Sequence, residues 1–367
     1  MSEVTVVGAG VCGLVAATAF AEAGFRVRLC EATAELGGDA ASWLAGGMLA
    51  PHCEAESASS AIVAPGLKAI DWWHDHASSV SRNGTLVVDP GRGGAELRRF
   101  AARTQGHETL DAEAVASLEP ALDGRFRHAL FFPDEAHLQP RVALTELESR
   151  LRWHGASMEF GTVADPRQMD GMVLDCRGAR ADAPGLRCVR GEMLLLRCPD
   201  VSLTRPVRIL HPRWPVYVVP HGDDRVMVGA SMIESDDRRG ITLRSTVELM
   251  NAAYALHPAF ADAELLEARS GLRPAFADNM PRLVRNGPVL ALAGAYRHGF
   301  LLAPDLAGQA VRMANPEVVH ASVQFRSHEE ARQAIFEYVE VYYNHRRRDS
   351  SLGYLTPCEA ECQATAA

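Results

Sequence analysis

Lysine is almost absent from this chain of 367 residues, in which Lys68 is the only one. Chemistry that forms a Schiff base therefore has a single candidate residue. The eight cysteines include no CxxC pair, so we predict neither a metal site nor a disulfide framework. No apolar run reaches the roughly 18 residues of a membrane span. The N-terminus has no basic region followed by a long apolar stretch, so we expect no secretory leader.

Positive charge is also in deficit. The chain has 37 Lys and Arg against 46 Asp and Glu, a net charge of -9. This balance argues against a protein whose main task is to bind a phosphate backbone. Hydrophobic residues make up 47% and charged residues 23%, which is typical of a globular protein. We expect a cytoplasmic protein with reduced thiols, no membrane partner and no nucleic-acid partner.

The strongest motif that is present lies at the N-terminus, EVTVVGAGVCGLVAATAFAEAGFRVRLCE. A short valine-rich strand leads into GxGxxG, formed by Gly8, Gly10 and Gly13. An alanine-rich helix ends at Gly24, and a second strand over residues 26–30 ends in Glu31. The pattern predicts a strand–helix–strand unit that binds a dinucleotide.

Each part of this unit has a physical reason. Gly8 permits the tight turn, Gly10 lets a pyrophosphate approach the backbone, and Gly13 lets helix and strand pack closely. The helix N-terminus offers free N–H groups to the phosphates. Glu31 is placed to accept hydrogen bonds from the ribose hydroxyls, and an acid here argues against NADP. The motif alone leaves both FAD and NAD open.

The next segment favours FAD. ELGGDAASWLAGGMLAPHCEAE, residues 35–56, is long, irregular and rich in small residues, which lets a flat cofactor lie against the backbone. A nicotinamide enzyme would more commonly continue into another helix–strand unit. A surface loop without a ligand is the structural alternative for this composition.

Further segments make the chain resemble a known family. They are HLQPRVALTEL (137–147), VRGEMLLL (189–196), PVYVVPHGDDRVMVGASM (215–232), SGLRPAFADNMP (270–281) and GAYRHGFLLAP (294–304). With the N-terminal unit and AGGMLAPHCEAE, they make residues 1 to about 313 resemble the D-amino acid oxidase superfamily of flavoenzymes. Within it, the chain is most similar to the glycine oxidases of thiamine biosynthesis.

The resemblance implies FAD as cofactor and α/β architecture. A Rossmann-like FAD-binding domain would comprise residues 1–75, 140–195 and 265–315, and a mixed-sheet α+β substrate domain residues 76–139 and 196–264. We expect a hairpin of two strands, PVYVVP and DRVMVGAS, in the substrate domain. A strand over Val289–Ala293 should precede a helix over Leu306–Met313.

Site residues are likewise implied by the resemblance. Arg273 would bind the substrate carboxylate through its guanidinium fork, Tyr217 would help to fix that carboxylate, and Met232 and Arg297 would line the pocket. The implied cofactor-binding residues are Gly8, Gly10, Val11, Cys12, Gly13, Glu31, Ala32, Ala41, Ser42, Gly46, Gly47, Met48, Val163, Gly271, Gly294, Tyr296, His298, Gly299, Phe300 and Leu301.

The implied reaction is oxidation of an amine. A hydride would pass from the substrate α-carbon to flavin N5, the imine would hydrolyse, and dioxygen would reoxidise the flavin to give hydrogen peroxide. Residues 173–185 and the segment LHPRWP depart from the family pattern. The substrate therefore stays open between glycine, sarcosine and a D-amino acid. The rival interpretations are an FAD-dependent D-amino acid or sarcosine dehydrogenase or oxidase outside thiamine synthesis, a nicotinamide dehydrogenase, and an inactive cofactor-binding fusion. Association into homo-oligomers is possible for each.

The last fifty residues resemble something else. The core YNHRRRDSSLGYLTP is similar to the C-terminal end of insertion-sequence transposases of the DDE type. Ser327 and Glu330 form a capping box, which predicts a short helix in a tail over residues 316–367. The arginines at 346–348 follow the predicted end of that helix, where the dipole favours cations. The three metal-binding carboxylates of such enzymes would lie upstream, so transposase activity is not implied.

Overall fold

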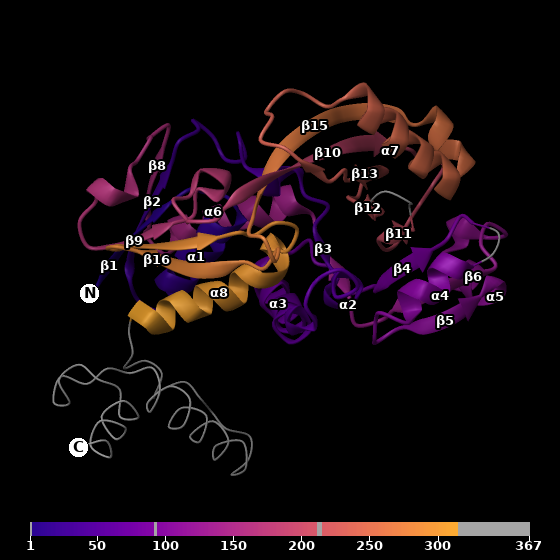
Figure 1. The fold of residues 1–367 in the computed structure, drawn as a ribbon, viewed down its shortest axis with the longest axis horizontal. Coiled ribbons are helices and arrows are strands. Elements are labelled where there is room, and N and C mark those ends of the chain that lie inside the picture. The colour runs from indigo at the N-terminus through magenta and orange to yellow at the C-terminus, as the bar shows by residue number, and fades with distance from the viewer. Residues whose placement is uncertain (1, 92–93, 211–214, 315–367) are drawn as a thin grey trace, which may run out of the picture. The chain divides into compact units, whose positions relative to one another are not determined.

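The computed structural model describes residues 2–91, 94–210 and 215–314 (Figure 1), and the residues up to Ala314 belong to one unit. The predicted tail helix, its capping box and its arginine run lie outside the described residues. Two large sheets and one pair of short strands build the described unit.

The first sheet carries the dinucleotide motif. Its strands, in spatial order, are β16 (Arg282–Asn286), β17 (Val289–Ala293), β9 (Met172–Asp175), β1 (Glu3–Val7), β2 (Arg26–Glu31) and β8 (Ser157–Phe160). All neighbours are parallel except the hairpin of β16 and β17. The predicted strands at the N-terminus and at Val289–Ala293 are thereby confirmed.

Four helices pack against or beside this sheet: α1 (Val11–Glu22), α3 (Val63–His76), α6 (Pro140–Trp153) and α8 (Gly299–Ala314). Helix α1 contacts both α6 and α8, and α3 contacts α8 (Figure 1). Leu14, Phe20 and Trp73 are fully buried between them. Small residues dominate α1, which is buried along most of its length and therefore needs close approach on several sides.

Helix α8 begins earlier than predicted. We expected it to start at Leu306. A proline at position 304 removes a backbone donor and disfavours a helix that continues through it. The helix instead starts at Gly299 and runs through Pro304. The carbonyl that Pro304 cannot serve is that of Phe300, and it accepts a hydrogen bond from Trp73 Nε1 at 2.7 Å. A side chain of α3 thus satisfies the orphaned acceptor.

The second sheet is mixed. Its spatial order is β14 (Ile233–Glu234), β10 (Arg187–Arg197), β13 (Arg225–Gly229), β12 (Val216–Pro220), β11 (Val207–Ile209), β4 (Thr85–Val88), β6 (His128–Phe132) and β5 (Glu108–Asp111), and β15 (Glu264–Ala275) also pairs with β10. The predicted hairpin is confirmed as the antiparallel pair β12–β13. Helix α7 (Leu243–Leu256) packs against β10, β12 and β13.

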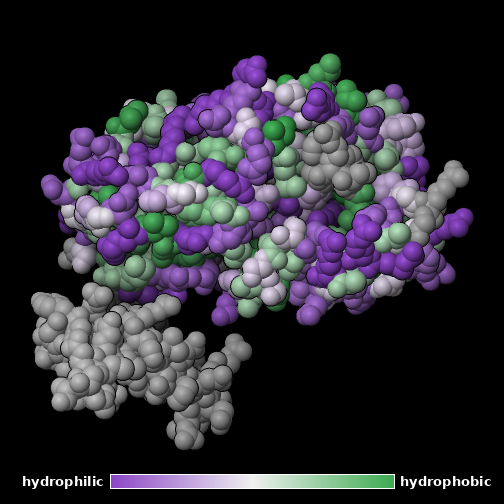
Figure 2. Space-filling model, in the orientation of Figure 1, coloured by the Kyte–Doolittle hydropathy of each residue, from purple (hydrophilic) through white to green (hydrophobic). Residues whose placement is uncertain are grey.

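Shorter elements complete the unit: β3 (Met48–Leu49) paired with β7 (Ala136–His137), α2 (Pro51–Glu54), α4 (Ala95–Ala101) and α5 (Ala112–Leu118). Each large sheet has its own apolar core, the first around Leu14 and Leu174 and the second around Leu194 and Val218. Figure 2 shows polar side chains over much of the face in view, with apolar ones in separate groups. The α/β fold with a second mixed sheet agrees with the prediction.

Across the described ranges, none of the helices is long and apolar enough to cross a membrane.

Candidate cofactor and substrate site

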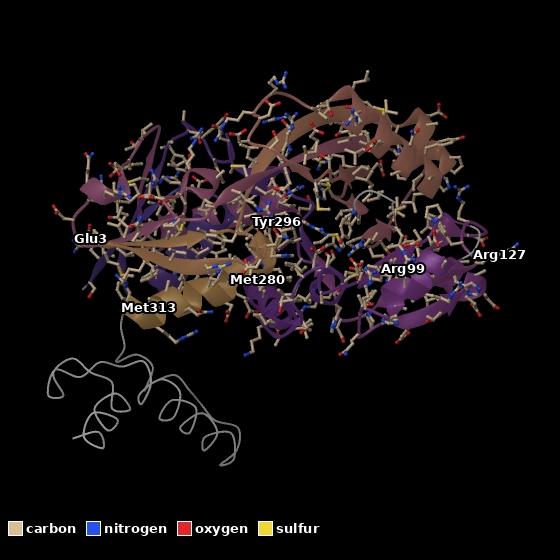
Figure 3. The ribbon with its side chains drawn as sticks, in the orientation of Figure 1. Glu3, Arg99, Arg127, Met280, Tyr296 and Met313 are labelled. Carbon is tan, nitrogen blue, oxygen red and sulfur yellow. The ribbon has the colours of Figure 1, made fainter. Side chains whose placement is uncertain are left out.

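A cavity of about 550 Å³ lies where residues of the two sheets meet. Its lining includes the glycine loop after β1, the small-residue segment 37–48, the start of α8 and inward-facing positions of β10, β12, β13 and β15. Tyr296, which Figure 3 labels near the middle of the molecule, belongs to this lining. The cavity therefore joins the predicted dinucleotide motif to the predicted substrate residues.

The glycines of the loop after β1 have different roles: some allow close packing, and one leaves space for a ligand. Gly8 has φ +104, and a Cβ there would meet the Cys176 carbonyl oxygen at 2.7 Å. A Cβ on Gly13 would overlap the Gly8 carbonyl oxygen. A Cβ on Gly10 would touch only Ser42 Oγ at 3.5 Å, so the space over Gly10 is open. Gly13 therefore serves the fold, whereas Gly10 leaves room for a group in the cavity.

The start of α1 suits an anion. Gly10 is the N-cap and contributes no side-chain acceptor. Val11 N–H donates to Ser42 Oγ at 3.1 Å. The other N–H groups of the first turn have no intrahelical partner and carry the positive end of the helix dipole. A pyrophosphate fits this position because it supplies the missing acceptors.

Glu31 ends β2 beside this loop and lines the cavity. Its Oε2 accepts from Ala9 N–H at 2.7 Å, and its Oε1 accepts from Thr33 N–H at 2.9 Å. These bonds hold the carboxylate against the glycine loop. The Thr33 hydroxyl also donates to Oε1 at 3.0 Å, so that of the roughly four acceptor positions of a carboxylate one remains, on Oε2, for a ribose hydroxyl. The residues present thus fit the adenosine and pyrophosphate parts of FAD.

Most of the residues predicted for the site do line the cavity. They are Gly8, Gly10, Val11, Cys12, Glu31, Ala32, Ala41, Ser42, Gly46, Gly47, Met48, Val163, Tyr217, Met232, Gly271, Arg273, Tyr296, Arg297, Gly299, Phe300 and Leu301. Gly299, Phe300 and Leu301 form the first turn of α8, so this helix N-terminus faces the cavity.

Three predicted residues lie behind the lining instead. Gly13 packs against the Gly8 carbonyl, as its motif position predicts. Gly294 has φ +77 and faces the Phe276 ring, so it serves the turn after β17. His298 is 2% exposed and does not line the cavity, although Arg297 and Gly299 on either side of it do.

Arg273 projects from β15 over a position of the neighbouring strand β10 that has no side chain. Gly191 of β10 lies under its guanidinium, and a Cβ at that position would overlap the guanidinium group. Arg273 Nη1 donates to the Ser231 carbonyl at 3.0 Å. Burial and the nearby Arg297 charge lower the pKa of Arg273 to about 10, so the side chain stays cationic at neutral pH. Within the described ranges, no carboxylate lies within ion-pair distance of it.

Arg297 has a carboxylate partner that the sequence did not predict. Its Nη2 donates to Glu54 Oε1 at 2.5 Å, and Tyr217 O–H donates to the same oxygen at 2.6 Å. Glu54 ends the four-residue helix α2 and lines the cavity. Its motif, AGGMLAPHCEAE, contributed to the family resemblance, but its partner lies 243 positions away. Only the tertiary fold brings the two together.

The charges around Glu54 decide its ionisation. Burial alone would raise the pKa of Glu54, but Arg297, His298, Arg208 and the Tyr217 hydroxyl outweigh burial and lower it to about 2. Burial raises the pKa of the Tyr217 phenol well above its usual value, so Tyr217 keeps its proton. Glu54 is consequently an ion-pair partner and a weak base at neutral pH.

Buried histidines predict acid sensitivity. Burial lowers the pKa of His137, His221 and His298 to about 4, from an ordinary 6.5. Between these values the unfolded chain binds more protons than the folded one, so the stability they contribute is present above pH 6.5 and is lost as pH falls toward 4. Glu135, whose pKa burial raises to about 7, has the opposite effect but is one group against three.

We therefore expect the free energy of unfolding to fall from pH 6.5 to pH 4.5, by about 1.4 kcal/mol per pH unit for each net proton. Urea titrations at several pH values measure this slope. A His137→Asn variant should show a smaller slope. Equal stability of the wild type at pH 6.5 and 4.5 would contradict the prediction.

No cluster of three or more His, Cys, Asp or Glu suited to a metal ion occurs in the parts of the chain that the structure describes.

Comparison with known proteins agrees with this geometry. Residues 3–312 match the family described as FAD dependent oxidoreductase, and residues 315–364 match the integrase core domain. The putative thiamine biosynthesis oxidoreductase ThiO of Rhizobium etli is 51% identical over 313 residues, which cover 84% of this chain and 95% of that protein. The glycine oxidase of Pseudomonas aeruginosa is 25% identical over 351 residues, covering 83% and 92%.

A solved structure gives the same result for the fold. The crystal structure of glycine oxidase from Geobacillus kaustophilus superimposes with a TM-score of 0.73 at 22% sequence identity, covering 86% of this chain and 95% of that one. At this identity the likeness shows a shared fold.

Proposed function

Because the chain belongs to the FAD dependent oxidoreductase family and is an FAD-dependent enzyme, we propose that it oxidises glycine or a similarly small amino acid at its carbon–nitrogen bond. The proposed setting is thiamine biosynthesis, which is the role named for the relative that is 51% identical. The single observation that carries the substrate class is Arg273, a partly buried cation in the cavity with only a backbone acceptor.

The chain's own residues would hold FAD along the cavity. The first turn of α1 and Gly10 would take the pyrophosphate, and Glu31 the ribose. The small residues at 41–48 and the first turn of α8 would border the flavin ring. The chemistry that FAD supplies when bound is acceptance of a hydride, followed by reoxidation with dioxygen to hydrogen peroxide.

Arg273 would bind the substrate carboxylate through two parallel charge-assisted hydrogen bonds. This contact fixes one end of a small molecule, so the α-carbon is held in one orientation. Tyr217 O–H donates to Glu54 Oε1, and its oxygen accepts a longer bond from Arg297 Nη2 at 3.3 Å, which leaves one acceptor position on that oxygen. The remaining acceptor position of Tyr217 would take an amine N–H of the substrate, and its predicted role in fixing the carboxylate remains a prediction.

The amine must lose its extra proton before the carbon–hydrogen bond is cleaved. Glu54 stays ionised down to a pKa of about 2 and is a poor proton acceptor at neutral pH. The ammonium proton therefore goes to water. Loss of hydride gives an imine, which water hydrolyses to a 2-oxo acid and ammonia. For glycine the products are glyoxylate, ammonia and hydrogen peroxide.

Purified full-length protein tests the proposal. It should be yellow, and it should release hydrogen peroxide with at least one of glycine, sarcosine or a small D-amino acid. A peroxide assay over this panel, with the visible spectrum recorded on the same sample, decides the substrate. A flavin-loaded protein that produces no peroxide with any member would refute amine oxidation.

A further inference from the structure

Two partly buried arginines, Arg273 and Arg297, line the substrate end of the cavity, and they differ in which group neutralises their charge. Arg273 Nη1 donates to the Ser231 carbonyl at 3.0 Å, and the Met232 sulfur lies 3.5 Å from Arg297 Nη1. The two guanidinium groups therefore flank one dipeptide. Arg297 alone has a carboxylate partner, Glu54 at 2.5 Å.

Glu54 is committed to this pair. Its Oε1 accepts from both Arg297 and Tyr217, while its Oε2 is buried, with His298 Nδ1 3.6 Å away. A ligand in the cavity would therefore encounter Arg297 already paired with Glu54. Because the dielectric of a partly buried site is low, the two charges neutralise each other strongly.

Other arginines along the cavity do not replace Arg297. Arg177 pairs with Asp175 and Arg180 with Asp39, beside the small-residue segment. Arg238 and Arg269 line the cavity but are exposed, so water screens their charge.

We propose that Glu54 is a specificity-determining residue: by occupying Arg297 it leaves Arg273 as the cation that can bind a carboxylate among the described residues at the substrate end, so that the enzyme selects amines with a single carboxylate and rejects dicarboxylates. This inference rests on the proposed function, because it assumes that Arg273 binds the substrate carboxylate.

The physical reason is the charge that a second carboxylate would meet. With Arg273 occupied, the second carboxylate would lie near Arg297 and therefore near the Glu54 anion. Like charges in a site of low dielectric repel each other strongly, and the desolvated anion would lack an unoccupied cation. Removing the Glu54 charge frees the guanidinium of Arg297, which stays protonated at every working pH.

A Glu54→Gln variant tests this with two matched pairs of ligands. N-ethylglycine and iminodiacetate are similar in size and differ by one carboxylate, as do the unreactive ethoxyacetate and diglycolate. For the wild type we expect preference for the monocarboxylate of each pair. In Glu54→Gln the ratio of kcat/KM values and the ratio of Kd values should shift toward the dicarboxylate by at least about tenfold.

The control is Glu56→Gln. Glu56 pairs with Arg103 and Arg208 close to the same helix and lies outside the lining, so its ratios should equal those of the wild type. A Glu54→Gln/Arg297→Gln double variant should lose the gain, because the freed cation is absent. If Glu54→Gln fails to retain flavin, Glu54→Ser carries the same expectation.

Ratios in the Glu54 variant within twofold of the wild type would overturn the inference, whatever happens to the absolute rates. The Kd values of ethoxyacetate and diglycolate, taken from flavin absorbance changes, need no turnover. If no amine is oxidised by any variant, the proposed reaction fails while these binding ratios still decide the role of Glu54.

Discussion

Replacing Arg273 with alanine is expected to raise the Michaelis constant of the amino acid substrate by at least about a hundredfold, because two charge-assisted hydrogen bonds are lost. The Michaelis constant should change by a larger factor than kcat, since the substrate carboxylate lies away from the carbon–hydrogen bond that breaks. Steady-state peroxide assays on the wild type and the variant measure both constants.

Two further variants sharpen this test. Gly191→Ala keeps the arginine but places a Cβ where its guanidinium lies, so we expect a similar rise in the Michaelis constant. Arg197→Ala is the control, because Arg197 lies on the same strand as Gly191 and forms only an exposed ion pair with Glu264. Since exposed pairs contribute little to stability, we expect the Michaelis constant of this variant to equal that of the wild type. Unchanged constants for Arg273→Ala would remove Arg273 from the site.

The second large effect is expected for alanine substitutions of Gly10 and Gly13, two glycines of the same GxGxxG motif. Gly10→Ala should leave the stability of the cofactor-free protein nearly unchanged, because its Cβ meets only Ser42 Oγ at 3.5 Å. The same methyl group would project into the space assigned to the pyrophosphate, so the Kd for FAD should rise at least about tenfold. Equilibrium titration of the cofactor-free protein with FAD measures it.

Gly13→Ala should have the opposite profile. Its Cβ would overlap the Gly8 backbone carbonyl, which cannot move without shifting β1 from α1, so the fold itself should be destabilised. Thermal melting of both cofactor-free variants separates the two roles. Equal melting temperatures for the two variants would contradict the proposal that Gly13 serves the packing of the fold and Gly10 the binding of the cofactor.

Local sequence determined the parts of this protein whose geometry depends on near neighbours. The strand β1, helix α1 and strand β2 follow from a valine run, three glycines and an alanine-rich stretch. The hairpin β12–β13 follows from alternating apolar residues around a short turn. The family resemblance extended this to FAD, to the oxidoreductase class and to the integrase-like tail, and the comparisons confirm all three.

Other expectations of the same kind remain predictions. They include the boundaries between cofactor and substrate domains, the roles of individual site residues, a cytoplasmic location and association into homo-oligomers.

Only the tertiary structure decided the features that depend on distant partners. Helix α8 passes through Pro304 because Trp73, on another helix, serves the Phe300 carbonyl. Likewise, the chain places Glu54 and Arg297 far apart, and nothing local distinguishes either from a surface charge. Their pairing arises when α2 and the loop before α8 meet across the cavity, and it leaves Arg273 without a carboxylate partner among the residues that the structure describes. Electrostatic interactions act through space, so the sequence supplied the residue types and the fold supplied the distances that give them a function.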